Sequence, residues 1–255
     1  MSLRALWIDL ISALQFLTRV PVRLSSHDDG ALARSARFFP AVGLVVGGSA
    51  GLLYLFLDAH LPKLVTGIFV VAYLVCATGC LHEDALADAA DGFGGGWNRE
   101  QILTILRDSR IGSYGGAALV LSLGLRAVLL SSLSRAQVLP LMVSAHVLCR
   151  WSTLPLSYFL PAARVSVDGE INGQGARVAK HISPGTLIFG TLFSGLCCGV
   201  LLRWNSVPPI LVSIALTFAS GLYYKRWIGG VTGDCFGATN QLTEIAVYVC
   251  GVWAT

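Results

Sequence analysis

The sequence predicts an all-α fold, a multi-pass integral membrane helical bundle of about six to eight helices that forms a single membrane-embedded domain over residues 1–255. Hydrophobic residues make up 55% of the 255 residues and charged residues only 13%, with a mean hydropathy of +0.69. Soluble domains are typically about 25% charged. The apolar residues also fall in stretches of about 20, the length that an α-helix needs to cross a bilayer.

Six apolar stretches are candidate membrane spans: 41–61, 64–81, 117–134, 138–160, 186–203 and 208–224. A seventh, 242–254, is short, and we expect its helix to begin earlier. The seven cysteines form no Cys-x-x-Cys pair, so neither a disulfide framework nor a zinc site is expected.

Residues 1–40 are predicted to form an N-terminal interfacial or re-entrant segment, with a helix over 5–22. Asp9 interrupts the apolar run there, and Arg19 and Arg23 follow it. This is not the pattern of a cleavable signal peptide.

Basic residues predict the orientation, because short loops rich in Lys and Arg stay on the cytoplasmic side. With the N-terminus inside, thirteen basic residues fall on the cytoplasmic side, and the outer loops hold three, namely Lys63, Arg135 and Arg203. This orientation places 82–96, 161–185 and 225–244 on one cytoplasmic face. It also accounts for the net charge of +4, so no nucleic-acid partner is expected.

An acidic motif, "HEDALADAADGFGGG" at 82–96, directly follows an apolar run. If 81–91 continues that helix, Asp84, Asp88 and Asp91 stand within about 60° of one another on one face. Three stacked carboxylates near a membrane surface repel one another and favour a bound cation. Oxygen ligands suit a hard ion, and Mg²⁺ that also bridges substrate phosphates is the predicted one. The alternative is a solvated acidic face paired with nearby arginines.

Small residues surround these carboxylates, namely Ala85, Ala87, Ala89 and Ala90. They allow another helix or a bulky substrate to approach closely, which disfavours a plain solvated face. Glu83 points about 100° away from Asp84 and is a weaker ligand candidate. His82 is a candidate base, a phosphate donor or an interfacial residue.

A glycine cluster closes the motif, at Gly92, Gly94, Gly95 and Gly96. It is expected to end the helix, either as a turn in which Gly94 and Gly95 bind anionic substrate oxygen through backbone N–H groups, or as a plain helix stop. Asn98 and Gln101 then resemble a capping box that begins a new helix.

That new helix is predicted to be amphipathic over 99–110 and to lie on the membrane surface. Arg107 and Arg110 share a face at its end and are candidate substrate-binding residues, because guanidinium groups bind phosphates in a bidentate manner. The alternative is a salt bridge with Asp108 or Asp88.

A second polar cluster, "YYKRWIGGVTGDCFGATNQLTE" at 223–244, contains Asp234 in an otherwise apolar region. Ionisable residues at membrane depth are functional candidates. Glu244 is either a further site residue or a helix cap. The hydrophilic loop at 161–185 is either a mobile substrate lid or a linker.

Five stretches together are specific: "FLTRVPV", "FFPAVGLVVG", "LHEDALADAADGFGGG", "RDSRIGSYGG" and "GGVTGDCFGA". In combination they make the chain resemble, nearly end to end, the cobalamin synthase family of adenosylcobinamide-GDP ribazoletransferases. Members usually carry glycine where this chain has Ala85 and often a hydroxyl residue where it has Ala89. These departures spare every carboxylate and affect only fine positioning.

The resemblance implies a phosphoryl transfer of vitamin B12 biosynthesis. The ribose 3′-hydroxyl of α-ribazole, or of its 5′-phosphate, attacks the phosphorus on the cobinamide arm of adenosylcobinamide-GDP and expels GMP. Mg²⁺ held by the three aspartates of the motif neutralises charge, Arg107 and Arg110 bind the phosphates or GMP, and Asp234 holds a second metal or accepts the hydroxyl proton. The residues carried over as catalytic are His82, Asp84, Asp88, Asp91 and Asp234.

The resemblance also implies a bacterial cytoplasmic (inner) membrane location with the active site on the cytoplasmic face. Expected partners are the two substrates, membrane lipid, and either a second copy of the chain or other corrinoid-pathway enzymes. A prenyl or CDP-alcohol transferase is an alternative, but it needs a second acidic motif that Asp234 alone does not make. A cation-coupled transporter is a third, although the acids cluster at one face and only Arg126 and Arg150 lie inside spans.

Overall fold

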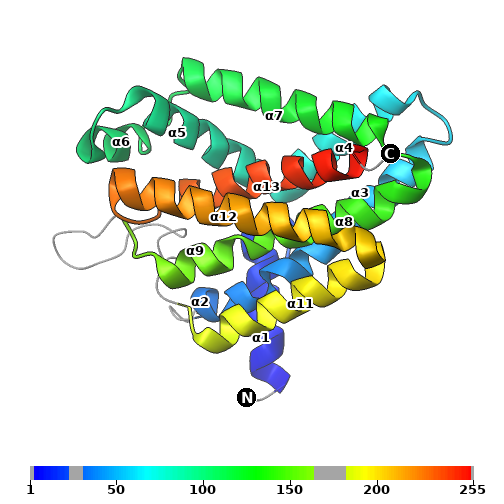
Figure 1. Cartoon of the computed structure of the whole chain (residues 1–255), viewed down its shortest axis with the longest axis horizontal. Coiled ribbons are helices and arrows are strands. Elements are labelled where there is room, and N and C mark those ends of the chain that lie inside the picture. The colour runs from blue at the N-terminus through cyan, green and yellow to red at the C-terminus, as the bar shows by residue number, and fades with distance from the viewer. Residues whose placement is uncertain (1–2, 23–30, 164–181, 254–255) are drawn as a thin grey trace.

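The computed structural model describes residues 3–22, 31–163 and 182–253, and these residues are almost entirely helical (Figure 1). Among them there is no strand, only an isolated parallel bridge between Ala162 and Val231. The elements are, in order, α1 (Leu3–Leu17), α2 (Ala31–Ser35), the 3-10 turn η1 (Ala36–Phe38), α3 (Phe39–Leu57), α4 (Lys63–Thr78), α5 (Leu81–Gly95), α6 (Arg99–Ile105), α7 (Ser113–Ser132), α8 (Arg135–Trp151), α9 (Thr153–Phe159), α11 (Pro184–Leu202), the 3-10 turn η2 (Arg203–Ser206), α12 (Val207–Ile228) and α13 (Gly233–Trp253).

The predicted all-α class is confirmed. Nine of the described helices are 15 residues or longer, slightly more than the six to eight expected, because the acidic motif forms a helix separate from the one before it. The last long helix begins at Gly233, well before the apolar stretch at 242–254, as expected.

Three stretches of the described chain are long and apolar enough to cross a membrane: Leu32–Leu57, Ser113–Ser132 and Pro184–Ile228, the last of which contains both α11 and α12. The pair α4 and α5 adds a fourth if the two bent helices count as one span. The spans predicted at 138–160 and 242–254 fall outside these stretches. Both regions contribute buried polar and charged side chains, and α8 is buried continuously over 141–150, so α8 and α13 form the centre of the bundle.

Helix α3 packs against α8 through a stripe of glycines. Gly43, Gly47 and Gly51 are spaced four residues apart and so lie on one face of α3. A Cβ atom on Gly47 would lie 2.6 Å from the carbonyl oxygen of Met142, and one on Gly43 would overlap the carbonyl group of His146. The stripe therefore lets the two backbones touch, as small residues do between membrane helices.

A sharp turn at Gly79 and Cys80 bends α5 by 91° from α4. Both residues have positive φ, 67° and 62°, which only the glycine adopts without strain. Arg19 lies directly against Gly79, where a Cβ atom would overlap its guanidinium, and its backbone N–H donates to the carbonyl of Ala77 at 2.8 Å. Residues 81–91 therefore do not continue the preceding helix, as the helical spacing of the aspartates had assumed, but belong to a helix of their own, α5.

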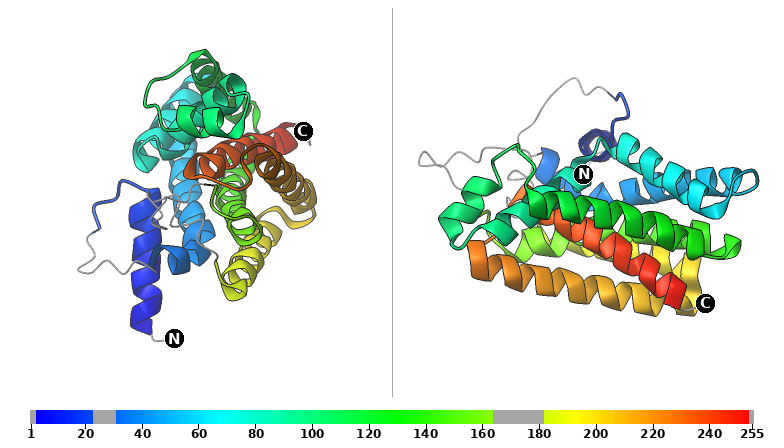
Figure 2. Two further views of the ribbon diagram at one scale, coloured as in Figure 1. Left: turned by 90° about the vertical axis from the view of Figure 1, so that its left-hand side faces the viewer. Right: turned by 90° about the horizontal axis from the view of Figure 1, so that it is seen from above.

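Helix α1 runs across the direction of the long helices and stands at one side of the bundle (Figures 1 and 2). Its Asp9 is 1% exposed and pairs with Arg37 of η1 at 2.5 Å, while Trp7 is 64% exposed. A helix across the bundle is oriented as an interfacial helix would be, and the interfacial location remains a prediction.

The α3–α8 contact yields a stability prediction. Gly47→Ala is expected to lower the melting temperature in detergent, because its Cβ would meet the backbone of α8; overpacking of this kind typically costs about 1–3 kcal/mol. The matched control is Gly48→Ala, where nothing lies within 4 Å, and this change should be neutral or slightly stabilising. Equal melting temperatures for the two variants would contradict the packing described here.

Candidate active site

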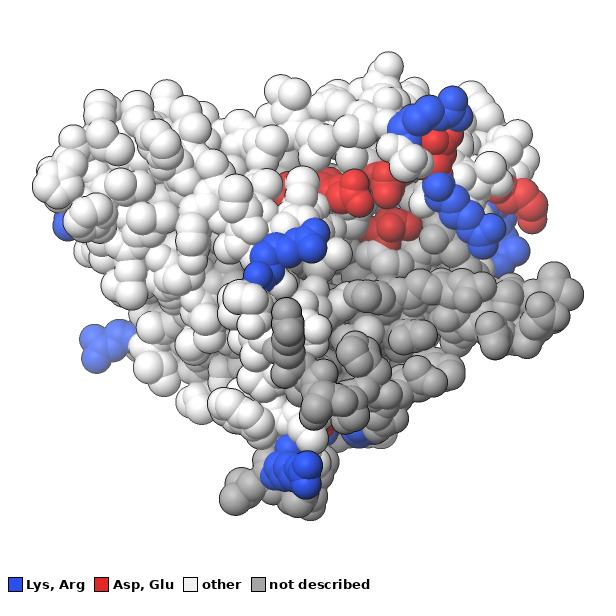
Figure 3. Space-filling view, turned by 180° about the vertical axis from the view of Figure 1, so that it is seen from behind, with Lys and Arg blue, Asp and Glu red and all other residues white. Residues whose placement is uncertain are grey.

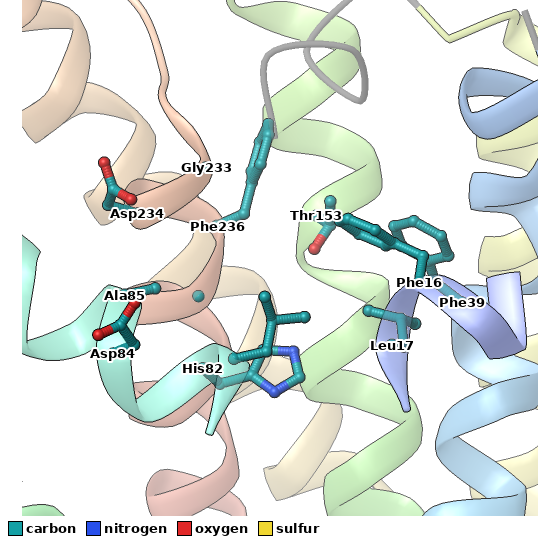
Figure 4. Close-up of a pocket in the computed structure, with 12 residues that line it drawn as sticks. Phe16, Leu17, Phe39, His82, Asp84, Ala85, Thr153, Gly233, Asp234 and Phe236 are labelled. Atoms are coloured by element: carbon teal, nitrogen blue, oxygen red, sulfur yellow. The ribbon is translucent and has the colours of Figure 1, made fainter. Parts of the chain in front are cut away.

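A pocket of about 200 Å³ brings together residues from α1, α3, α5, α9 and α13 (Figure 4). Two of its lining residues are carboxylates, Asp84 on α5 and Asp234 on α13, and they lie on the same side of the pocket. The imidazole of His82 also faces it. Three of the five predicted catalytic residues therefore meet in one place, although 150 residues separate Asp84 from Asp234 in the sequence.

Asp84 and Asp234 meet because α13 packs tightly on α5. A Cβ atom on Gly237 would overlap the Cβ of Ala85 and would lie 3.5 Å from the Cα of His82. Gly237 stands one turn after Asp234, and Ala85 directly follows Asp84. The prediction that small residues around the motif allow another helix to approach is confirmed at Ala85.

The backbone that leads into α13 is fixed against the end of α9. Val231 N–H donates to the carbonyl of Pro161, and Ala163 N–H donates to the carbonyl of Val231, both at 2.9 Å. A Cβ atom on Gly230 would overlap the Pro161 carbonyl. Asp234 follows in the first turn of α13, where its carboxylate accepts a hydrogen bond of 3.1 Å from the Thr232 hydroxyl.

The remaining two aspartates of the motif occupy different surroundings from Asp84. Asp88 is half-buried one turn further along α5. Asp91 is buried, and its two oxygens accept the backbone N–H groups of Gly112 at 2.7 Å and Gly115 at 2.9 Å. These groups belong to the N-terminus of α7, whose unpaired N–H groups favour a carboxylate. Asp91 thus caps α7, and metal binding by it stays a prediction.

Of the two expectations for the glycine cluster, the anion-binding turn is wrong, because α5 continues through Gly95. The plain helix stop is confirmed, because Gly96 is the C-cap of α5. Gly94 instead lets Tyr114 pack on the helix, since a Cβ atom would lie 2.7 Å from its ring. Gly95 faces an open hollow that Asp91, Asp108 and Arg110 also line. Substrate binding by Gly94 and Gly95 remains a prediction without the turn that motivated it.

The expected helix over 99–110 is shorter, because α6 ends at Ile105. Its predicted start is confirmed: the Asn98 side chain accepts the backbone N–H of Gln101 at 2.9 Å. Ile102 is fully buried and Leu106 is 4% exposed, so these two side chains pack in the core and do not lie on the membrane.

Arg107 and Arg110 therefore lie in the segment after α6 and not on a helix face. Arg107 is exposed. Arg110 pairs with Asp108 at 2.5 Å, which is the salt bridge given as the alternative. This guanidinium lowers the pKa of the Asp108 carboxyl from 3.8 to about 2. The predicted lid at 161–185 falls largely on 164–181, outside the described residues.

A buried ion-pair network lies behind the pocket, and the sequence did not reveal its pairing. Arg126 of α7 is 1% exposed and donates to Glu83 of α5 at 2.8 Å; its other terminal nitrogen lies 3.6 Å from Glu244 of α13. Gln241 of α13 also reaches Glu83 at 3.4 Å. Glu83 stands between His82 and Asp84, so the network fixes α5 directly beneath the pocket.

The network continues into α8. The Arg150 guanidinium donates to Nδ1 of His146 at 3.0 Å, and Nε2 of His146 lies 3.8 Å from Glu244. His146, Cys149 and Glu244 offer metal-ligand atoms within 4.8 Å of one another. However, Arg150 also contacts the Cys149 sulfur at 3.6 Å, and two arginines beside the group oppose a divalent cation. We therefore interpret these residues as part of the ion-pair network.

Most acidic side chains on one face of the molecule lie in the same region (Figure 3). Figure 3 shows acidic side chains in a hollow toward the end of the molecule that holds α5 and α6, with basic side chains at its margin. In this region the acidic side chains would attract cations bound to an anionic substrate, and the basic side chains would attract the substrate itself.

Comparison with known proteins assigns the chain to a family. The family described as cobalamin-5-phosphate synthase matches residues 9–252. The chain belongs to this family. No solved structure matches it.

Curated relatives in the cobalamin-5-phosphate synthase family are similar over nearly their whole length. Adenosylcobinamide-GDP ribazoletransferases from Azorhizobium caulinodans, Sinorhizobium medicae and Ralstonia nicotianae are 40%, 38% and 34% identical to the chain. The alignments cover 96%, 96% and 99% of this chain and 94%, 96% and 96% of the relatives. The resemblance seen in the sequence motifs is confirmed.

The buried network yields a stability prediction. Arg126→Met is expected to lower the melting temperature strongly, because it leaves Glu83 and Glu244 buried without their cation, a loss of about 3–5 kcal/mol. The control is Arg135→Met, whose side chain is 56% exposed and pairs with Asp58; exposed pairs contribute about 0–1 kcal/mol. If Arg126→Met and Arg135→Met have the same melting temperature, the buried network does not stabilise the bundle.

The α5–α13 contact yields a rescue prediction. Gly237→Ala should lower the melting temperature, because the new Cβ overlaps that of Ala85. Adding Ala85→Gly removes the overlap and leaves contacts of 3.5 and 3.6 Å to His82, so the double variant should melt above Gly237→Ala. Thermal unfolding followed by circular dichroism in detergent measures both. A double variant less stable than Gly237→Ala would show that the contact is not limiting.

Proposed function

We propose that this chain is the adenosylcobinamide-GDP ribazoletransferase of its organism, and that the pocket between α5 and α13 is its active site. The observation that carries the assignment of the site is the meeting of two family motifs there. "LHEDALADAADGFGGG" contributes His82 and Asp84, and "GGVTGDCFGA" contributes Asp234. The substrates are then a corrinoid that carries a GDP group and the nucleoside α-ribazole or its 5′-phosphate.

The pocket suits Mg²⁺. Asp84 is exposed, and its carboxylate has no hydrogen-bond or ion-pair partner among the described residues. Asp234 faces the same pocket from a second helix. Carboxylate oxygens are the ligands that Mg²⁺ takes, and the ion usually keeps water and binds substrate phosphates as well. Asp84 and Asp234 would hold it, with Asp88 one turn away as a further ligand, and the ion would neutralise charge on the diphosphate.

The chain's own residues then position the reactants and move one proton. The ribose hydroxyl of ribazole forms a bond to the phosphorus next to the cobinamide arm, the bond from that phosphorus to GMP breaks, and the hydroxyl proton must pass to a base. His82 is our candidate, because its imidazole faces the pocket beside Asp84 (Figure 4). Asp234 is the second candidate, since it lies across from His82 on α13.

The open hollow next to the pocket is our candidate site for the leaving group. It is lined by Asp91, Asp108 and Arg110. Asp91 lies about 10 Å along α5 from Asp84, which lines the pocket. Arg110 would exchange Asp108 for a phosphate, and Arg107 in the same segment would add a second guanidinium.

We also propose that the site faces the cytoplasm of a bacterial inner membrane. The support is the distribution of basic residues, which favours a cytoplasmic location for the segments that carry the two motifs. The prenyl transferase, CDP-alcohol transferase and transporter alternatives are not favoured, since the relatives are ribazoletransferases over nearly their full length.

The central test is a turnover assay on the purified chain in detergent, following corrinoid mass and GMP release together. We expect conversion that depends on Mg²⁺, and a loss of at least about 100-fold in kcat for Asp84→Asn and Asp234→Asn, the size typical for removal of one group that stabilises transition-state charge. The matched control is Glu100→Gln, an exposed residue in the first turn of α6.

Unchanged melting temperatures would show that the aspartate variants fold. Folded wild-type protein that converts no substrate would contradict the proposed activity. Folded Asp84→Asn and Asp234→Asn that turn over like Glu100→Gln would contradict the proposed site.

A further inference from the structure

The pocket is divided into an acidic side and an apolar side, and the mechanism uses only the acidic one. Phe16 and Leu17 of α1 and Phe39 of α3 line the side opposite Asp84 and Asp234 (Figure 4). The rings of Phe16 and Phe39 stack at 5.7 Å with an interplanar angle of 22°. The same side carries one hydroxyl group, that of Thr153, which points into the pocket.

We propose that this apolar side binds the aromatic base of ribazole and that Phe16, Phe39 and Thr153 determine which base the enzyme accepts. The inference rests on the proposed function and assigns one half of the pocket to one half of one substrate. Ribazole is a bicyclic, methylated benzimidazole joined to a ribose. Its base is therefore bonded directly to the sugar that carries the reactive hydroxyl.

The size of the pocket supports a nucleoside and excludes a corrin ring. Sites for drug-sized ligands typically measure about 300–1,000 Å³, and this pocket measures about 200 Å³. A bicyclic base with part of its ribose is of that order, whereas a corrin macrocycle is much larger. The corrinoid therefore presents only its phosphate to Asp84 and Asp234 and remains outside the pocket.

The chemistry of the apolar side favours benzimidazole over guanine, the other base in the reaction. Glycosylated dimethylbenzimidazole has no N–H donor and a single ring nitrogen that accepts a hydrogen bond, and the Thr153 hydroxyl can donate one. Guanine carries several donors and acceptors, which would stay unpaired against the two phenylalanines and the leucine of the apolar side at a large cost. Phe236 of α13 closes the pocket between the two sides.

The test measures both substrates separately. Phe16 is half-buried, so Phe16→Ala is expected to fold; it should raise the KM for α-ribazole about tenfold, since a base stacked on an aromatic side chain contributes about this factor. The KM for adenosylcobinamide-GDP should change less than twofold. Thr153→Val should reduce the enzyme's preference for the nucleoside of dimethylbenzimidazole over nucleosides of unsubstituted indole-like bases. Those bases lack the ring nitrogen that accepts the Thr153 hydrogen bond. Phe56→Ala, at a phenylalanine that is 64% exposed on α3, is the control.

Calorimetric titration of α-ribazole alone separates this proposal from the proposed activity. Tight binding to the wild type that Phe16→Ala weakens supports the base site, even if no turnover occurs. A variant that instead raises the KM for adenosylcobinamide-GDP would place guanine in the pocket and overturn the proposal. Unchanged binding and unchanged KM values for both substrates in folded Phe16→Ala would overturn it as well.

Discussion

The structure depends most on the buried ion pairs of Arg126. A guanidinium that is 1% exposed inside a membrane bundle is stable only with carboxylates beside it, and the two carboxylates come from α5 and α13. The pairing therefore requires both helices to lie beside α7. The same two helices carry Asp84 and Asp234. The charges that stabilise the centre of the bundle also set the positions of the charges that line the pocket.

Small residues let α13 approach α5 closely enough for their side chains to line one pocket. Ion pairs fix which helices are neighbours, and the absence of a side chain at Gly237 fixes how near α13 comes to Ala85. The glycine stripe of α3 does the same against α8. The pocket is what remains between α1, α3, α5, α9 and α13 once these contacts are made, which explains why one wall is acidic and the other apolar.

The helical class and part of the site could be predicted from the sequence. Apolar stretches of spanning length indicated the bundle, and the carboxylates at Asp84 and Asp234 stood out because charges are rare in such a chain. The role of Asp91 could not be predicted in the same way, because its partners, Gly112 and Gly115, follow 21 and 24 residues later and approach it only after the chain turns back.

The pairing of Glu83 with Arg126 also depends on tertiary structure, yet one pattern pointed toward it. Arg126 and Arg150 lie inside apolar helices, and Glu83 and Glu244 are the acids on the helices beside them. Buried charges of this kind need partners, so these four residues were candidates for one another. The turn at Gly79 and Cys80 was visible only as a glycine after an apolar run, which is also the pattern of a helix that continues.

On the proposed function, Asp84 and Asp234 form one cation site from two helices. Electron paramagnetic resonance of Mn²⁺ added to the purified chain measures this directly, since Mn²⁺ takes the oxygen ligands that suit Mg²⁺. We expect bound Mn²⁺ that Mg²⁺ displaces, with affinity reduced in both Asp84→Asn and Asp234→Asn and unchanged in Glu100→Gln. Mn²⁺ that binds both aspartate variants as tightly as the wild type would contradict it.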